Sequence, residues 1–249
     1  MNGPWAKARP ILLVVVLGLG LPYLAAFAAL LASRLFHAPA PPPRGSLLPW
    51  LYSHHAFQLL FALAAIAIVK RFRPFDAGLR APPGRSYVVP ALLWGTFFGV
   101  LMTLVDYAPD LAAMRAPHLD YPLTTSNVVG WTLFQGVYVG PTEEIPFRSL
   151  LVGYLVAALP GRVRVGRYEM SWGGVIVAAI FALAHASSLV LRPSWASFGQ
   201  QIYAFALGVL YAYWFEKSRS VLAPILGHNA SDVVEYGLVL ALIAAWGPG

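Results

Sequence analysis

The sequence contains no cysteine and few charged residues, and each shortage excludes a class of protein. Without cysteine, the chain has no disulfide, no thiolate nucleophile and no cysteine-bound zinc. Only 11% of its 249 residues are charged, whereas about a quarter are charged in a typical soluble domain. Hydrophobic residues make up 59%. This composition excludes an ordinary soluble domain and predicts an all-α polytopic membrane protein.

Acidic residues are scarcer than basic ones, and the formal net charge is +7. A basic chain can bind nucleic acid, but here the basic residues stand in short clusters beside apolar runs and not along one soluble face. Clusters of this kind are typical of membrane topology signals. We therefore expect the lipid bilayer as a partner and no nucleic acid.

Seven apolar runs are each long enough to cross the ~30 Å hydrocarbon core of a bilayer as a helix. We expect a bundle of about seven transmembrane helices in a single domain, residues 1–249, or eight if the fourth run, which contains prolines, is split. The first run exceeds the ~7–15-residue apolar region of a signal peptide, so we expect residues 1–33 to be retained. The runs are 11–33, 47–69, 87–105, 127–159, 172–191, 197–215 and 221–246.

Positive charges are distributed unevenly between the two sides of this bundle. With the N-terminus in the cytoplasm, twelve basic residues lie inside and four outside, as the positive-inside rule requires. We therefore expect a multi-pass protein of the cell membrane with a cytoplasmic N-terminus and an external C-terminus. The inner residues are Lys7, Arg9, Lys70, Arg71, Arg73, Arg80, Arg85, Arg162, Arg164, Arg167, Lys217 and Arg219, and the outer ones are Arg34, Arg44, Arg115 and Arg192.

The fourth run contains two carboxylates and a guanidinium, and charges inside a bilayer are costly and usually functional. On a helix, Glu144 and Arg148 lie on one face, so we interpret them as a structural ion pair. Glu143 is turned about 100° away and is less compensated, which suits a general base. Pro141 and Pro146 flank the two acids and predict a kink that frees backbone groups for a polar site.

Two histidines interrupt later apolar runs. His185 stands alone in its run, whereas His228, Asp232 and Glu235 share one face of the last run. A lone buried histidine usually satisfies an internal hydrogen bond, but together with the intramembrane carboxylates these residues indicate one site. Glu235 lies farther along, and we expect it to pair with a neighbour.

A second pair of histidines, His54 and His55, stands near the start of the second run. Adjacent positions on a helix point about 100° apart, so the two rings cannot both face one site. We interpret them as interfacial or packing residues.

The order of these groups resembles the CPBP family of intramembrane glutamic endopeptidases, which includes the CAAX prenyl endopeptidase and bacterial relatives. Each motif is short, but the ordered trio in a polytopic membrane protein is fairly specific. It leaves the first three runs unmatched and implies a catalytic core at about 127–246. The motifs are Glu143-Glu144-x-x-x-Arg148, Phe181-x-x-x-His185 and His228-x-x-x-Asp232.

The resemblance implies roles for these residues. The first glutamate of the pair, matching Glu143, activates the water, and the histidine that matches His185 assists it. The last motif supplies a histidine, matching His228, and usually an asparagine for the oxyanion. This chain has Asp232 there, and an ionised aspartate cannot donate a hydrogen bond to an oxyanion. Either Asp232 is protonated, which we favour, or it orients His228; Asn229 is a possible substitute donor.

We therefore predict an intramembrane endopeptidase that hydrolyses a membrane-associated protein or peptide with glutamate-activated water, without a cofactor or metal. The catalytic residues would be Glu143, Glu144, His185, His228 and Asp232. One alternative is a zinc-dependent membrane protease that uses the same histidines and acids, although the sequence lacks His-Glu-x-x-His. A second alternative is a non-catalytic membrane scaffold or transporter that uses these groups as a binding or proton site.

Overall fold

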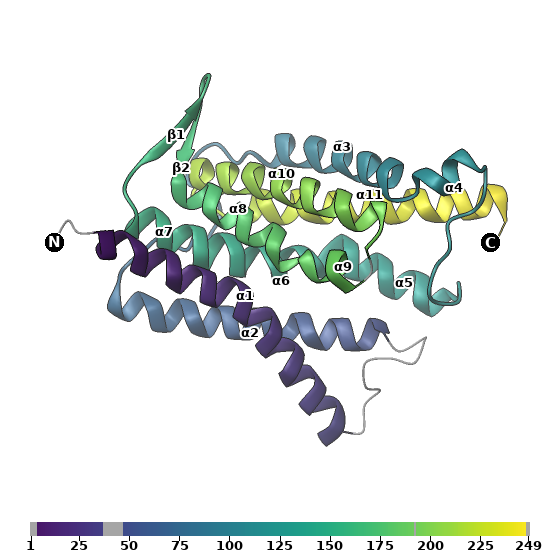
Figure 1. Ribbon diagram of the computed structural model, residues 1–249, viewed down its shortest axis with the longest axis horizontal. Helices are drawn as coiled ribbons and strands as arrows, with labels where there is room; N and C mark the ends of the chain where they lie inside the picture. The colour runs from purple at the N-terminus through teal and green to yellow at the C-terminus, as the bar shows by residue number, and fades with distance from the viewer. Residues whose placement is uncertain (1–3, 37–46, 192, 248–249) are drawn as a thin grey trace.

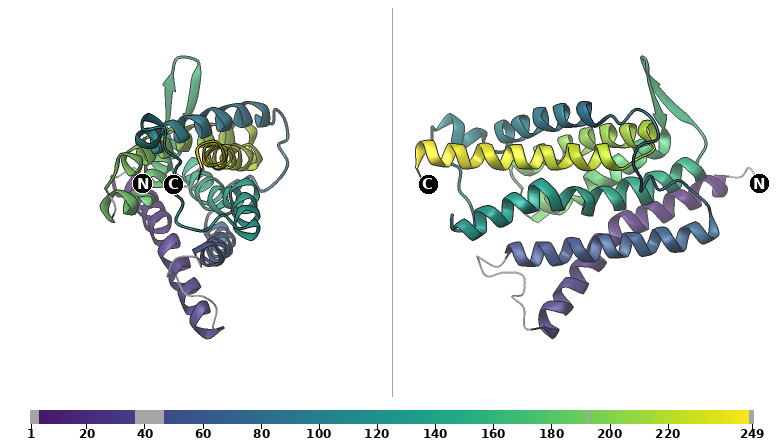
Figure 2. Two further views of the ribbon diagram at one scale, coloured as in Figure 1. Left: turned by 90° about the vertical axis from the view of Figure 1, so that its right-hand side faces the viewer. Right: turned by 180° about the vertical axis from the view of Figure 1, so that it is seen from behind.

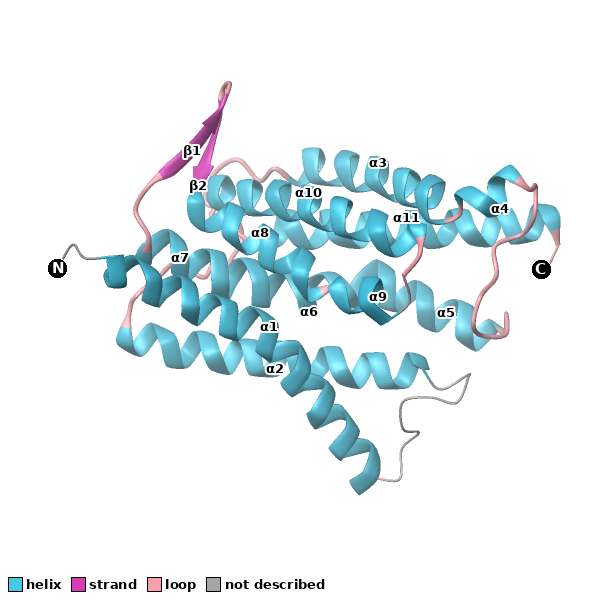
Figure 3. Ribbon diagram, viewed as in Figure 1, coloured by secondary structure: helices cyan, strands magenta, loops and turns pink. Residues whose placement is uncertain are grey.

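The computed structural model describes residues 4–36, 47–191 and 193–247, and most of this part is helical (Figure 3). Arg44 and Arg192, which enter the topology prediction, lie outside the described residues. The helices are α1 Pro4–Leu35, α2 Leu47–Phe72, α3 Val88–Asp106, α4 Ala108–Ala112, α5 Thr125–Leu133, η1 Phe134–Tyr138, α6 Val139–Glu144, η2 Ile145–Val152, α7 Gly153–Ala158, α8 Trp172–Ala184, α9 Ala186–Leu191, α10 Trp195–Ser218 and α11 Leu222–Trp246; the strands are β1 Arg162–Val165 and β2 Tyr168–Ser171.

The long helices run side by side along the long axis of the molecule, and α1 crosses α2 obliquely (Figures 1 and 2). The N-terminal and C-terminal ends lie at opposite ends of this bundle (Figure 1). The segment from α5 to α7 lies within the bundle and contacts α2, α8 and α11. Helices α1 and α10 also contact this segment, at η2.

Five helical spans of the described residues are long and apolar enough to cross a membrane. Their outer faces carry large apolar side chains, such as Leu93 and Phe97, which are 67% and 53% exposed. Such extensive apolar exposure would be unfavourable in water and is expected against lipid. The prediction of a mostly helical, multi-pass membrane protein is confirmed. The spans are Ala8–Leu35, Leu47–Phe72, Val88–Asp106, Trp172–Leu191 and Leu222–Trp246.

The segment that carries the glutamates is a helix with two π-helical stretches, η1 and η2, on either side of α6. Pro141 has no N–H, so the carbonyl of Val137, four residues earlier, loses its usual donor, and the amide nitrogen of Asn229 donates to it instead (3.3 Å). Pro146 frees the carbonyl of Thr142 in the same way. The neighbouring helices therefore complete the backbone of this segment.

The carbonyl of Thr142, which Pro146 leaves free, accepts a hydrogen bond from helix α2. The amide nitrogen of Gln58 in α2 donates to it over 3.0 Å. On the opposite side, the backbone N–H of Gly140 donates to Oδ1 of Asn229 (2.8 Å), and a Cβ at position 140 would collide with this oxygen. Two amide side chains thus hold the irregular segment between α2 and α11, and π-helical turns of this kind occur frequently at functional sites.

Helix α11 is held in place by close packing on α3. Gly99 of α3 lies so near the α11 backbone that an added Cβ would stand 2.5 Å from the carbonyl oxygen of Ser231. A small residue in this position lets two membrane helices approach closely. This packing fixes the helix that presents His228.

An antiparallel hairpin, β1–β2, projects from the end of the bundle where the N-terminus lies (Figure 1). Arg162 pairs with Ser171, and Val165 pairs with Tyr168 beside a turn at Gly166, whose φ is +58°. The sequence interpretation places only a basic connection here, so the hairpin is a feature that it missed.

Candidate active site

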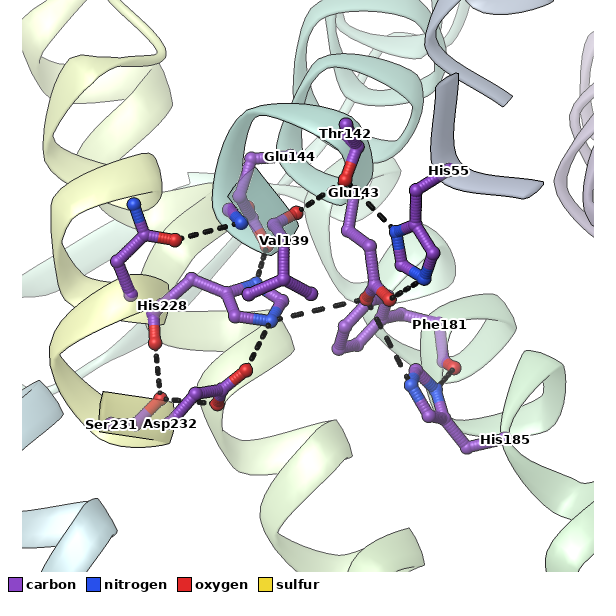
Figure 4. A network of polar contacts seen from close by, with 12 residues as sticks. His55, Val139, Thr142, Glu143, Glu144, Phe181, His185, His228, Ser231 and Asp232 are labelled. Atoms are coloured by element: carbon purple, nitrogen blue, oxygen red, sulfur yellow. Dashed lines mark hydrogen bonds and ion pairs between the residues drawn. The ribbon is translucent and has the colours of Figure 1, made fainter. Parts of the chain in front are cut away.

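The carboxylate of Glu143 lies among three imidazole rings that come from three different parts of the bundle (Figure 4). Nε2 of His55, on α2, is 4.0 Å from Oε1. Nε2 of His185, between α8 and α9, and Nε2 of His228, on α11, are each 3.9 Å from Oε2. The structure thus brings Glu143, His185 and His228 together, and it adds a histidine from outside the sequence motifs.

The rings of His185 and His228 are each anchored through the other ring nitrogen. Nδ1 of His185 lies 2.8 Å from the carbonyl oxygen of Phe181, one turn earlier in α8. Nδ1 of His228 lies 2.8 Å from Oε1 of Glu144. A carbonyl oxygen only accepts hydrogen bonds, and an ionised carboxylate does the same. Each Nδ1 therefore carries its hydrogen and donates it, which directs Nε2 toward Glu143.

The position of His185 follows from the way its helix begins and ends. The Ser171 side chain caps the start of α8 by accepting from the N–H of Gly174 (3.0 Å). The helix then ends at Ala184, and His185 is its C-terminal cap. A residue at a helix break can direct its side chain into the bundle without interrupting a regular helical face.

The separations of 3.9–4.0 Å between Glu143 and the ring nitrogens are too long for direct hydrogen bonds. They are short enough for one water, or one substrate oxygen, to contact the carboxylate and a ring together. The Glu143 side chain is 16% exposed, and that of His185 is 27% exposed. The carboxylate and the His185 ring are therefore both partly accessible.

Glu144 forms contacts with both Arg148 and His228. Nε of Arg148 lies 2.8 Å from Oε2 of Glu144, and both side chains are completely buried. The guanidinium also lies over the Phe181 ring, 4.9 Å from its centre. A buried ion pair of this kind is costly to break on one side only. It holds α6 and η2 in register and gives His228 a fixed acceptor.

Asp232 lies one turn after His228 on α11. Its Oδ2 is 3.5 Å from Nε2 of His228, the nitrogen that also faces Glu143. Glu235 has a different environment, because its nearest acidic neighbours are Asp106 and Asp232. Both the oxygen and the nitrogen of the Asn229 amide bond to the backbone of the glutamate segment, so the structure does not favour it as a substitute oxyanion donor.

Residues 125–234 match the family model described as type II CAAX prenyl endopeptidase, Rce1-like. We call this matched part of the chain, residues 125–234, the Rce1-like domain. No curated protein and no solved structure matches the chain. The Rce1-like family is a family of endopeptidases, and the resemblance read from the motifs is therefore confirmed.

The Rce1-like domain contains four of the residues around the carboxylate site, namely Glu143, Glu144, His185 and His228, and it also contains Asp232. It does not contain α2, so His55 is contributed from outside it. We interpreted both His54 and His55 as interfacial or packing residues. This agrees with His54, which stacks on Trp50 and does not share the site, but His55 faces Glu143. One signal was available, since His55 and Gln58 are polar and share a face of an apolar run.

The zinc-dependent alternative requires side chains arranged to bind a metal ion. Among residues 4–36, 47–191 and 193–247, no group of three or more histidine, aspartate or glutamate side chains is arranged to hold a metal ion. The His185, His228, Glu143 and Asp232 set considered for zinc thus has no further support from the geometry.

Proposed function

We propose that this chain is an intramembrane endopeptidase that hydrolyses a peptide bond with water activated by Glu143. One observation carries the proposal: a single partly buried carboxylate lies 3.9–4.0 Å from three ring nitrogens, each positioned through its other nitrogen. The surrounding Rce1-like domain supports the same activity. A carboxylate with histidines at this range is suited to general-base catalysis.

In the proposed reaction, the water oxygen attacks the peptide carbonyl carbon while Glu143 accepts one of the water protons. The carbonyl oxygen becomes an oxyanion in the tetrahedral intermediate. When the C–N bond breaks, Glu143 returns the proton to the leaving nitrogen, so the products are a carboxylic acid and an amine. No covalent acyl-enzyme forms.

The other residues have supporting roles in this proposal. His228 and Asp232 face the oxyanion, and His185, whose Nε2 lies 3.9 Å from Oε2, assists Glu143 from the side of that oxygen. Glu144 and Arg148 hold His228 and the glutamate segment in place. Because Nδ1 of His228 donates to Glu144, its Nε2 is the nitrogen available to the reacting groups.

The proposed topology has seven membrane crossings in one domain, residues 1–249. The five spans named above would be joined by α10 and by the continuous segment from α5 to α7, whose bounds agree with the sixth and fourth apolar runs. The end of α2, with Lys70 and Arg71, and the hairpin, with Arg162 and Arg164, lie at the same end as the N-terminus (Figure 1). This arrangement supports a cytoplasmic N-terminus and an external C-terminus in the cell membrane.

The substrate class that the proposal tests first is a membrane-anchored peptide tail, because the family description names a prenyl endopeptidase. The probe is an internally quenched peptide with S-farnesylcysteine followed by three residues. We expect wild-type protein in liposomes to cleave it and Glu143→Gln to be inactive while folded.

Membranes from cells that carry wild type or Glu143→Gln should be compared in parallel for protein termini that go uncut. If Glu143→Gln cleaves the probe like wild type, the proposed mechanism is wrong. If neither the probe nor any membrane protein is cleaved in a Glu143-dependent way, a binding or transport role for the same groups would replace it.

A further inference from the structure

His55, which α2 places beside Glu143, lies outside the Rce1-like domain, and the reaction described above gives it no role. We propose that His55 orients the attacking water by accepting a hydrogen bond at Nε2, an inference that rests on the proposed function. The water would lie between this nitrogen and Oε1 of Glu143, which are 4.0 Å apart.

The tautomer of His55 follows from the hydrogen bonds of Thr142. The Thr142 hydroxyl lies 2.9 Å from the carbonyl oxygen of Tyr138 and 2.8 Å from that of Val139, and it can only donate to these acceptors. Its single hydrogen is thereby used. Nδ1 of His55, 2.9 Å from the same hydroxyl oxygen, must therefore be the donor. In the neutral ring, Nε2 then carries a free lone pair directed at Glu143.

A water between two acceptors has one arrangement available. It donates one hydrogen to Oε1 of Glu143 and the other to Nε2 of His55, so its lone pairs point away from both groups toward a substrate carbonyl. Glu143 then accepts the first hydrogen as the C–O bond forms, and His55 gains no proton. Orientation of a reactant in this way lowers the barrier because less freedom is lost in the transition state.

The ring of His55 is held firmly enough for this role. The residue is only 6% exposed, and Phe134 packs edge-on against the ring with a centroid distance of 5.0 Å. Gln58, one turn later on α2, fixes the carbonyl of Thr142, the residue that anchors Nδ1. His54 offers a contrast on the same helix, because its Nε2 lies 3.1 Å from the carbonyl oxygen of Pro22 in α1.

The two amide replacements of His55 separate water orientation from packing. A glutamine places its side-chain oxygen near the position of Nε2, whereas an asparagine places an N–H near Nδ1 and leaves the Nε2 position empty. We expect kcat on the farnesylated probe to fall on the order of 100-fold in His55→Asn, with KM little changed. His55→Gln should recover a large part of the loss, and His54→Asn is the matched control that keeps wild-type kcat.

A purely structural role predicts the reverse order, because asparagine retains the donor to Thr142. If His55→Asn matches wild type and His55→Gln does not, the water-orienting role is overturned. Failure of the proposed function has a different signature, which is an active Glu143→Gln variant. An inactive Glu143→Gln variant beside fully active His55→Asn would remove only the inference about His55.

A second measurement needs no substrate. Nitrogen NMR of protein labelled with ¹⁵N-histidine in nanodiscs distinguishes a ring nitrogen that carries hydrogen from one that does not. We expect His55, assigned by its loss in His55→Gln, to carry hydrogen on Nδ1 alone, and its Nε2 signal to shift in Glu143→Gln. A hydrogen found on Nε2 of a neutral ring, or a signal unaffected by Glu143→Gln, would overturn the proposal.

Discussion

Glu144 and Arg148 form an ion pair 2.8 Å long in which neither side chain has any exposed surface. The same carboxylate accepts from His228, so two basic side chains, Arg148 of η2 and His228 of α11, depend on one acid. Arg148 pairs with Glu144, whereas the carboxylate of the adjacent Glu143 lies 3.9–4.0 Å from three imidazole nitrogens. Neighbouring glutamates of the same chain segment therefore have separate consequences when each is changed.

Glu144→Gln should destabilise the protein by about 3–5 kcal/mol, because it leaves the Arg148 guanidinium without a partner in a buried site. Glu143→Gln should abolish cleavage with little loss of stability. Thermal unfolding in detergent and probe cleavage, measured on the same preparations, test both expectations. In Glu144→Gln/Arg148→Met the charge is also removed, and this variant should be more stable than Glu144→Gln. Equal stability of the two single variants would contradict this division.

Asp232→Asn should retain or raise activity, because the amide can donate a hydrogen bond where Asp232 lies beside His228. The measurement is the pH–rate profile of wild type and variant. A wild-type rate that falls as pH rises, with the fall absent in the variant, fits an aspartic acid that must stay protonated to donate. If the variant is inactive at every pH yet melts like wild type, Asp232 instead orients His228, and an orienting aspartate is worth orders of magnitude in rate.

Probe cleavage in liposomes should be unaffected by strong chelators such as EDTA and 1,10-phenanthroline, because a carboxylate that activates water needs no ion. Reagents that irreversibly modify serine or cysteine should also leave the rate unchanged. The zinc content of each preparation, measured by elemental analysis, should be compared with its cleavage activity. A stoichiometric metal content that rises and falls with activity would replace this mechanism by a metal-dependent one.

Gln58→Leu should lower stability by about 1–3 kcal/mol, because the carbonyl of Thr142 would lose the side-chain donor that replaces the N–H missing at Pro146. The effect should be smaller in a Pro146→Ala background, where the backbone N–H of residue 146 is restored. Thermal melts of the two single variants and the double variant give the coupling energy. Additive effects would show that Gln58 stabilises the protein in some other way.

Asp76 lies outside the membrane, in the connection between α2 and α3, and it should make the stability of the protein depend on pH. Burial raises its pKa, but the N–H of Gly78 and the guanidinium groups of Arg80 and Arg219 act in the opposite direction, and the net pKa is lowered. A carboxyl with a lowered folded-state pKa stabilises the fold at neutral pH and loses this contribution as pH falls through that pKa. Melting temperature should therefore drop less between pH 6 and pH 3 in Asp76→Asn than in wild type, and an identical drop would contradict the assignment.

Much of the helical fold was predictable because apolar length and proline position are local properties. The predicted run 47–69 corresponds to helix α2, Leu47–Phe72, and the predicted run 221–246 corresponds to helix α11, Leu222–Trp246. The prolines of the fourth run also predicted freed backbone groups, although not that these would be paired by Gln58 and Asn229. The hairpin was missed because its strands are four residues each and its arginines resemble an ordinary basic loop.

The candidate site was only partly predictable. The helical spacing of Glu144 and Arg148 is local and was sufficient to pair them, whereas the position of His55 depends on how α2 is rotated within the bundle. Counting residues from the helix ends places Glu143 near mid-membrane and His228 nearer one end, yet their side chains lie 3.9 Å apart. Such counting assumes that helices begin at one level, and only tertiary packing sets those levels.

Asn229, which pairs the carbonyl that Pro141 leaves free, belongs to the last helix of the chain. During synthesis, Gln58 and His55 of α2 are made before the segment with both glutamates, whereas Asn229 and His228 of α11 are made after it. A nascent chain that has not yet released α11 from the ribosome lacks His228 as well as this amide. The proposed hydrolysis therefore depends on α11 joining the bundle, which follows the insertion of both glutamates.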